Sequence, residues 1–212
     1  MGRVWDLHTV RGLAVTGVVA GLALACGTVA WELWRTRGGG TLAAGSSDPD
    51  GPDDSLALRG LDRAALDDLR KRRLVFPVEG VRPESLIDSF ADPRGAGTRL
   101  HRAVDILAPR RTPVRAVEAG TVARLLRSGS GGISVYQFDP DERYCYYYAH
   151  LDGYAPGLTE GAKVERGQLL GYVGTTGNAP ASTPHLHFAI YRLSDAKQWW
   201  AGTALNPYPV FR

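Results

Sequence analysis

The sequence has few of the residues that cross-link a small secreted fold or bind nucleic acid. Its 212 residues include only two cysteines, Cys26 and Cys145, which form no disulfide framework and show no metal-binding spacing. The 25 basic and 22 acidic residues nearly balance, to a formal net charge of +3, and the arginines are scattered along the chain. We therefore expect no nucleic-acid partner, and we expect Cys145 to remain a free, buried thiol.

Charge is also missing from one long N-terminal run, residues 13–31, LAVTGVVAGLALACGTVAW. About 20 apolar residues are needed to cross the bilayer core as a helix. Arg3 and Arg11 precede the run. We expect residues 1–37 to be a short cytoplasmic N-terminus and a single-pass anchor in the cytoplasmic membrane, with the rest of the chain outside. A cleaved signal sequence and a lipoprotein processed at Cys26 remain open alternatives.

Two short segments follow the anchor. Residues 38–57 are rich in Gly, Ser, Asp and Pro and have no hydrophobic period, which is typical of a flexible linker. Residues 58–73 carry apolar side chains at helical spacing, namely Leu61, Ala65, Leu66 and Leu69. This pattern predicts a short amphipathic helix with no chemistry of its own.

From residue 74 the pattern changes to short apolar runs broken by Gly, Pro, Asp and Ser. The candidate strands are residues 74–78, 112–126, 132–138, 143–151, 163–174 and 184–193. No segment after Arg73 has a convincing helical period. We therefore expect residues 74–212 to form one all-β domain, with its sheet closed or folded over itself.

Two histidines lie close together inside the last apolar run, STPHLHFAI. His185 and His187 are two residues apart, so on a strand they share one face, with Leu186 and Phe188 on the other. Two neighbouring imidazoles on a strand form either a hydrogen-bonded structural pair or part of a metal site.

Three more candidate residues belong to the same domain: His101 and Asp105 in HRAVD, and His150 in YYYAHL. The spacing of four residues between His101 and Asp105 would put both on one face of an extended segment. Two histidines and one aspartate would supply three ligands to a zinc ion and leave its fourth coordination position open, as in catalytic zinc sites. Together these residues indicate a metal site.

The ordered series FPVEG, HRAVD, YYYAHL, EGAKVERGQLLGYVGTTGN and PHLHF, within residues 76–211, resembles the LytM/lysostaphin-type zinc metallopeptidase family. Members of this family cut peptide cross-links in bacterial peptidoglycan. The resemblance implies a compact antiparallel β-sandwich or open barrel of the duplicated hybrid motif type. It also implies that Zn²⁺ is bound by His101, Asp105 and His187, and that His150 and His185 are catalytic without binding the metal. Which of these two is the general base stays open.

Several positions depart from the family pattern, namely Ala91, Asp92, Ala103 and Thr183. None of them removes a ligand, but each can alter the loops that shape the substrate groove. Tyr146 and Tyr148 share a strand face and are candidates to line that groove, although core packing is expected for at least one of them.

Three other functions stay open at this point: a catalytically inactive LytM-like module that binds the cell wall or activates other enzymes, a carrier-like β module, and a carbohydrate-binding domain with an incidental metal site. The expected partners are peptidoglycan stem peptides and their cross-links, together with the membrane through the N-terminal segment. The sequence does not reveal which cross-link is cut, the oligomeric state or any regulator.

Overall fold

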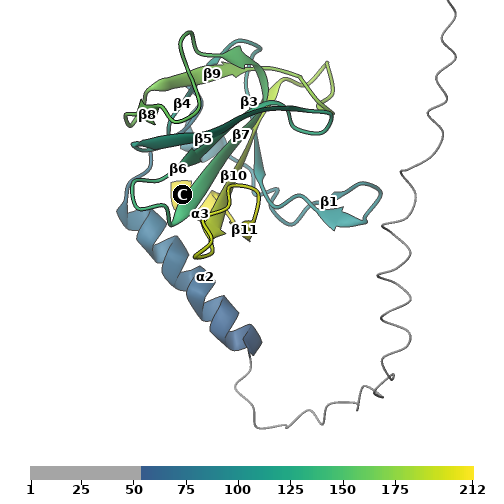
Figure 1. Ribbon diagram of the computed structural model, residues 1–212. Helices are drawn as coiled ribbons and strands as arrows, with labels where there is room; N and C mark the ends of the chain where they lie inside the picture. The colour runs from purple at the N-terminus through teal and green to yellow at the C-terminus, as the bar shows by residue number, and fades with distance from the viewer. Residues whose placement is uncertain (1–53) are drawn as a thin grey trace, which may run out of the picture. The chain divides into compact units, whose positions relative to one another are not determined.

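The centre of the structure is an antiparallel sheet of nine strands, in which β11, β10, β7, β6, β5 and β8 lie side by side in that order (Figure 1). The computed structural model describes residues 54–212, so the anchor, the signal alternatives and most of the linker lie outside the described residues. Within residues 54–212, no helix is both long and apolar enough to cross a membrane. The expectation of a mostly antiparallel β architecture is confirmed.

The main sheet consists of β3 (Val104–Leu107), β4 (Pro113–Arg115), β5 (Gly120–Ser128), β6 (Gly132–Phe138), β7 (Tyr144–Tyr154), β8 (Lys163–Val164), β9 (Leu169–Val173), β10 (His185–Leu193) and β11 (Gly202–Leu205). Two short strands, β1 (Pro93–Arg94) and β2 (Arg99–Leu100), form a separate hairpin. The helical elements are α2 (Asp54–Lys71), the 3₁₀ turn η1 (Pro83–Ser85) and α3 (Tyr208–Phe211). Strand β3 pairs with β10, and β9 pairs with both β4 and β7.

The strands agree with the sequence pattern where the apolar run is short. The run at residues 132–138 coincides with β6, whereas the two longest runs each divide into two strands. Residues 74–78 were expected to form a strand, and this is wrong: only an isolated bridge joins Val78 to Val114. Pro77 has no N–H to donate to a strand partner, so this run cannot form a regular ladder.

The buried face of the sheet carries the core. Leu186, Phe188 and Ile190 of β10 are fully buried, as expected for the face opposite the two histidines. Tyr146 and Tyr148 of β7 are also fully buried and pack against Phe188. The suggestion that one of these tyrosines lines the groove is therefore wrong.

Helix α2 packs on the sheet through one apolar face and several polar contacts. Ala65 and Leu69 are buried, whereas Leu61 is 52% exposed. The helix begins four residues before the expected start, at Asp54, a residue type that is common at helix starts. It ends at Lys71, close to Arg73, whose φ of 52° is left-handed and incompatible with a continuing helix.

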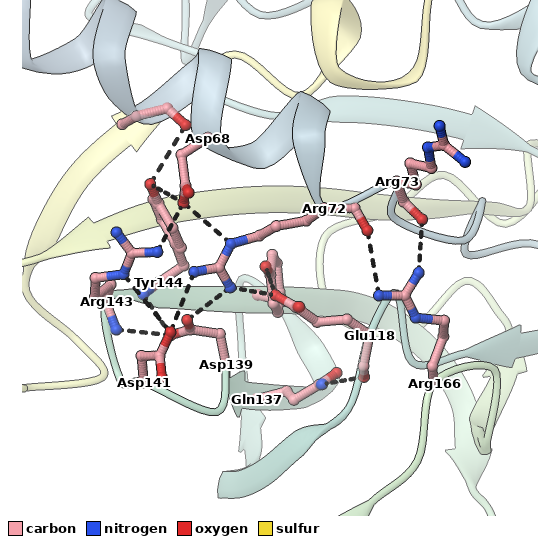
Figure 2. Close-up of polar contacts among 12 residues, drawn as sticks. Asp68, Arg72, Arg73, Glu118, Gln137, Asp139, Asp141, Arg143, Tyr144 and Arg166 are labelled. Carbon is pink, nitrogen blue, oxygen red and sulfur yellow. Dashed lines mark hydrogen bonds and ion pairs between the residues drawn. The ribbon is translucent and has the colours of Figure 1, made fainter.

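Figure 2 shows how the end of α2 is attached to the sheet. The guanidinium of Arg72 pairs with Glu118 at 3.0 Å and with Asp139 at 2.8 Å, and both carboxylates are buried. Arg166 donates to the backbone carbonyls of Arg72 and Arg73, at 3.2 and 2.9 Å. The carbonyls past the end of the helix therefore have a cationic partner.

Candidate active site

Three side chains meet at one edge of β10. The Nε2 atom of His101 lies 3.0 Å from the Nδ1 atom of His187 and 3.0 Å from the Oδ1 atom of Asp105. The distance from His187 Nδ1 to Asp105 Oδ1 is 3.1 Å, so these three atoms of His101, Asp105 and His187 form a triangle. The strand register explains the meeting, because His187 on β10 lies directly opposite Asp105 on β3.

The backbone conformation that places His101 at the triangle differs from the expected one. It lies before β3, and Arg102 between them has a left-handed φ of 58°, so residues 101–105 are not an extended segment. Four residues of extended strand would span about 13 Å, too far for both side chains to contact one ion. The kink at Arg102 is what brings His101 beside Asp105.

Backbone carbonyls fix the orientation of three of the four imidazoles. A carbonyl oxygen can only accept a hydrogen bond, so the ring nitrogen beside it must carry the proton. This leaves the lone pair of each neutral ring on Nε2. The bonds run from Nδ1 of His101 to Ser89 O at 2.9 Å, from Nδ1 of His150 to Thr176 O at 2.9 Å, and from Nδ1 of His185 to Thr183 O at 2.8 Å.

The charges at the triangle suit a cation. Burial raises the pKa of Asp105, but the hydrogen bonds and charges of His101 and His187 outweigh burial and hold this pKa well below its ordinary value. Burial lowers the pKa of His187 against the opposing effect of Asp105. At neutral pH the site therefore presents a carboxylate beside a neutral His187 imidazole.

The donor set fits a zinc ion. Ligands held about 2.0–2.2 Å from a tetrahedral zinc lie roughly 3.3–3.5 Å from one another, close to the sides of this triangle. His101, Asp105 and His187 are also the group of residues, within the part of the chain that the structure describes, whose ligand atoms could together hold a metal. His101 has a carbonyl partner on its other nitrogen, as histidine ligands usually do.

Two further histidines flank the triangle. The rings of His150 and His185 lie 5.0 Å apart, and the ring of His150 lies 5.5 Å from that of His187. His185 Nε2 is 3.8 Å from Asp105 Oδ1. Burial, followed by the charge of His187, lowers the pKa of His150 to about 4, so this ring is neutral at pH 7 and able to accept a proton.

His150 adopts an unusual backbone conformation. Its φ of 60° is left-handed, and its N–H donates to the carbonyl of Gly131 at 2.9 Å. Such conformations cost of order 1–3 kcal/mol and persist only where the surroundings impose them. His150 directly follows Ala149, which is the partner of His187 in the β7–β10 pairing. The left-handed residue therefore lies where the pairing of β7 with β10 ends.

A hollow of about 380 Å³ opens over the triangle, and a second of about 290 Å³ continues along Tyr147. The Tyr147 ring packs edge-on against His187, with ring centroids 5.9 Å apart. Arg94 and Arg99 of the β1–β2 hairpin also line the first hollow, and Arg94 donates to Asp105 Oδ2 at 2.9 Å. The expected site residues therefore all lie together in one cleft.

Sequence reasoning missed Tyr147, Arg94 and Arg99. A signal for the arginines was present, because RGAGTR places two glycines between them and such a loop is typical of a hairpin. The signal for Tyr147 was its place between Tyr146 and Tyr148. Because side chains alternate along a strand, Tyr147 faces the side of the sheet opposite to these two core tyrosines.

An antiparallel β domain with an open His–Asp–His ligand set and two additional histidines is suited to metal-assisted hydrolysis. The chain belongs to Peptidase family M23, whose sequence pattern matches residues 99–207. The resemblance to LytM and lysostaphin-type peptidases is thereby confirmed.

Individual relatives agree with this assignment. The L-Ala–D-Glu endopeptidase of Bacillus subtilis is 34% identical over 143 residues, which cover 65% of this chain and 42% of that protein. Lysostaphin of Staphylococcus simulans is 33% identical over 121 residues, covering 57% of this chain and 23% of that protein. The crystal structure of a LytM protein from Ruminococcus gnavus has 30% identity and a TM-score of 0.54, covering 66% of this chain and 60% of that one. This chain thus spans less than two thirds of each relative.

Proposed function

We propose that the protein is an exported zinc metallopeptidase that hydrolyses peptide cross-links of bacterial peptidoglycan. The observation that carries the proposal is the triangle of His101, Asp105 and His187 in the same cleft as His150 and His185. The names of two relatives in the family, an L-Ala–D-Glu endopeptidase and a glycyl-glycine endopeptidase, support a peptide bond as the target.

His101, Asp105 and His187 would hold the zinc ion. When bound, zinc lowers the pKa of a coordinated water from 15.7 to about 7 and polarises a carbonyl oxygen. The protein itself supplies the proton transfer. His150 and His185 each have the Nδ1 proton held by a backbone carbonyl, so in the neutral form of either ring Nε2 is the nitrogen able to take up a proton. One of the two would act as general base, taking a proton from the attacking water at Nε2 and returning it to the leaving amine. The other would lie beside the developing oxyanion as a hydrogen-bonding group.

Tyr147 and the arginines shape the surroundings of this chemistry. Tyr147 covers one side of His187 with an aromatic edge and restricts the ring on that side. Arg94 binds the Asp105 oxygen that lies outside the triangle, so Oδ1 stays directed toward the two imidazoles. A mutation of Arg94 would therefore change the geometry of the ligand rather than the proton transfer.

The test is digestion of purified peptidoglycan sacculi by the protein, with and without a chelator, and identification of the products by mass. We expect released peptide fragments, their loss with the chelator and their return with added zinc. The alternative, a catalytically inactive LytM-like wall-binding or activator module, predicts that the protein sediments with sacculi but releases nothing even when fully loaded with zinc.

Export is part of the proposal because peptidoglycan lies outside the cytoplasmic membrane. The uncharged run of residues 13–31 supports a single-pass anchor with the peptidase domain on the outer side. C-terminal fusions to two reporters, one active only in the cytoplasm and one only outside it, test this topology. Signal from the cytoplasmic reporter alone would contradict both the topology and the action on the wall.

A further inference from the structure

The β1–β2 hairpin brings two arginines to the cleft. Arg94 and Arg99 are direct cross-strand partners, and both line the hollow over the triangle. Figure 1 shows β1 and its loop projecting away from the main sheet. Two like charges in directly opposite positions destabilise a strand pair unless anions compensate them.

Only one of these two charges has an internal counter-charge. Arg94 is paired with Asp105 at 2.9 Å and lies 3.8 Å from Asp92. Arg99 is exposed and takes part in no ion pair with the residues from 54 to 212. Among the described residues, the Arg99 guanidinium beside the site therefore has no counter-charge.

The charge of Arg99 lies at the site itself. Arg99 lines both hollows, as do Asn178, His150 and His187. Asp105 is the one acidic residue among the side chains that line the two hollows, and Arg94 and the two imidazoles of the triangle already engage its oxygens. Among residues 54–212, the lining of these hollows therefore leaves the Arg99 guanidinium free to pair with an anionic group of a ligand.

We propose that Arg99 binds a carboxylate of the peptide substrate close to the scissile bond, so that the protein selects stem peptides with free carboxylates over neutral glycine bridges. The inference rests on the proposed function and names its substrate class. A guanidinium matches a carboxylate in bidentate geometry, and such charge-assisted bonds are stronger than neutral ones. The amide of Asn178, which lines the same two hollows, offers a further donor.

The test compares two synthetic stem peptides that differ only in their side-chain and α-carboxylates. Each is a dimer of L-Ala–D-Glu–diamino acid–D-Ala stems joined by a cross-link from the D-Ala of one stem to the diamino acid of the other. One dimer has all its remaining carboxylates free, and the other carries carboxamides at the D-Glu and diamino acid positions. For the wild type we expect kcat/KM to be about tenfold higher on the carboxylate peptide. Arg99→Ala should lose this preference, because its kcat/KM on the carboxylate peptide should fall toward that on the amidated peptide.

The controls separate charge at the cleft from charge elsewhere. Arg63→Ala removes an exposed arginine from α2, outside both hollows, and should keep the full preference. Arg99→Gln serves as a second variant should Arg99→Ala fail to fold, and zinc content checks that either variant keeps the site. High salt should reduce the preference of the wild type, because exposed charges are screened.

Binding is measured separately from cleavage, by titrating both peptides into the zinc-loaded His185→Ala protein with and without Arg99→Ala. The inference is supported if the carboxylate peptide binds more tightly than the amidated one and Arg99→Ala removes this difference. This outcome supports the inference even when the wild type cleaves neither peptide and the proposed function fails. Equal affinities for the two peptides, or a preference that survives Arg99→Ala, would overturn the inference even when both peptides are cleaved.

Discussion

The guanidinium of Arg72 lies 2.8 Å from the carboxylate of Asp139, whose side chain is fully buried. The same guanidinium pairs with Glu118 (Figure 2). Glu118 also accepts a hydrogen bond from the hydroxyl of Tyr146. Tyr146 in turn packs on Phe188, the neighbour of His187 on β10. Helix α2 is therefore joined to the core strands that carry the candidate site.

Replacing Arg72 by Met should destabilise the domain by about 3–5 kcal/mol, because two buried carboxylates would lose their cationic partner. Arg70→Ala is the matched control, since Arg70 pairs with Asp67 on the exposed face of α2 and should cost less than about 1 kcal/mol. Urea unfolding followed by fluorescence measures both variants. Equal losses of stability in the two variants would show that the buried network contributes little.

Zinc binding should depend on His187. The purified protein should hold about one zinc per chain after dialysis, and His187→Ala should lose it, because one of the three donor atoms of the triangle is removed. Metal content by mass spectrometry gives the result, and His185→Ala, next to the triangle but outside it, is the control. A His187→Ala protein with stoichiometric zinc would contradict the proposed ligand set.

The two flanking histidines should separate metal binding from turnover. His150→Ala and His185→Ala should keep zinc yet lose roughly 10²–10⁴-fold in turnover, the usual contribution of general acid–base groups. Peptide cleavage and zinc content are measured on the same preparations. Activity within a few-fold of the wild type in either variant would remove that residue from the mechanism.

Gly132 should control the orientation of His150 from a distance. A Cβ on Gly132, whose φ is 64°, would lie 2.2 Å from Thr176 Oγ1 and 2.6 Å from Gly177 N, so the Thr176 carbonyl that holds His150 would have to move. Gly132→Ala should lose about 1–3 kcal/mol of stability. It should also lower kcat while zinc stays bound. Gly129→Ala, in the connection that precedes β6 and with no atom within 4 Å of the added Cβ, should change neither.

The Cys145 thiol should be unreactive in the folded protein. It is fully buried, and burial together with the charge of Asp139 raises its pKa well above the ordinary value. In a Cys26→Ser variant, a thiol reagent should label about one group per chain in denaturant and almost none in buffer. Rapid labelling of the native variant would mean that this part of β7 opens easily.

The sequence predicts the strands well where turn residues bound a short apolar run, as at β6 and β10. It predicts the two-residue alternation that places His185 and His187 opposite Leu186 and Phe188, because this follows from strand geometry alone. It misses β3, β11 and the β1–β2 hairpin, because these strands of two to four residues carry too little pattern to be distinguished from loops.

The five residues expected at the site line one hollow, but the reason given for the proximity of one pair was wrong. His101 meets Asp105 through the left-handed Arg102, not through an extended strand. The partners that orient the imidazoles could not be found from residue types, because they are backbone carbonyls. Among the departures from the family pattern, Thr183 acts in this way, because Thr183 O accepts from Nδ1 of His185. Asp92 O instead accepts from the backbone N–H of His101.

Orientation by carbonyls makes the three imidazoles less dependent on side-chain identity than on loop length. Every residue type offers the same carbonyl, so Thr183 can be replaced while His185 keeps its tautomer. Thr176 and Ser89 are less replaceable, because their hydroxyls also bond to Ile133 N–H and Leu151 O and to Asp105 N–H. An insertion or deletion in these loops would instead shift the carbonyl by a whole residue and release the ring. Engineering of substrate choice should therefore proceed by substitution at fixed length in these segments, and libraries that vary loop length should spare the residues immediately around these three positions.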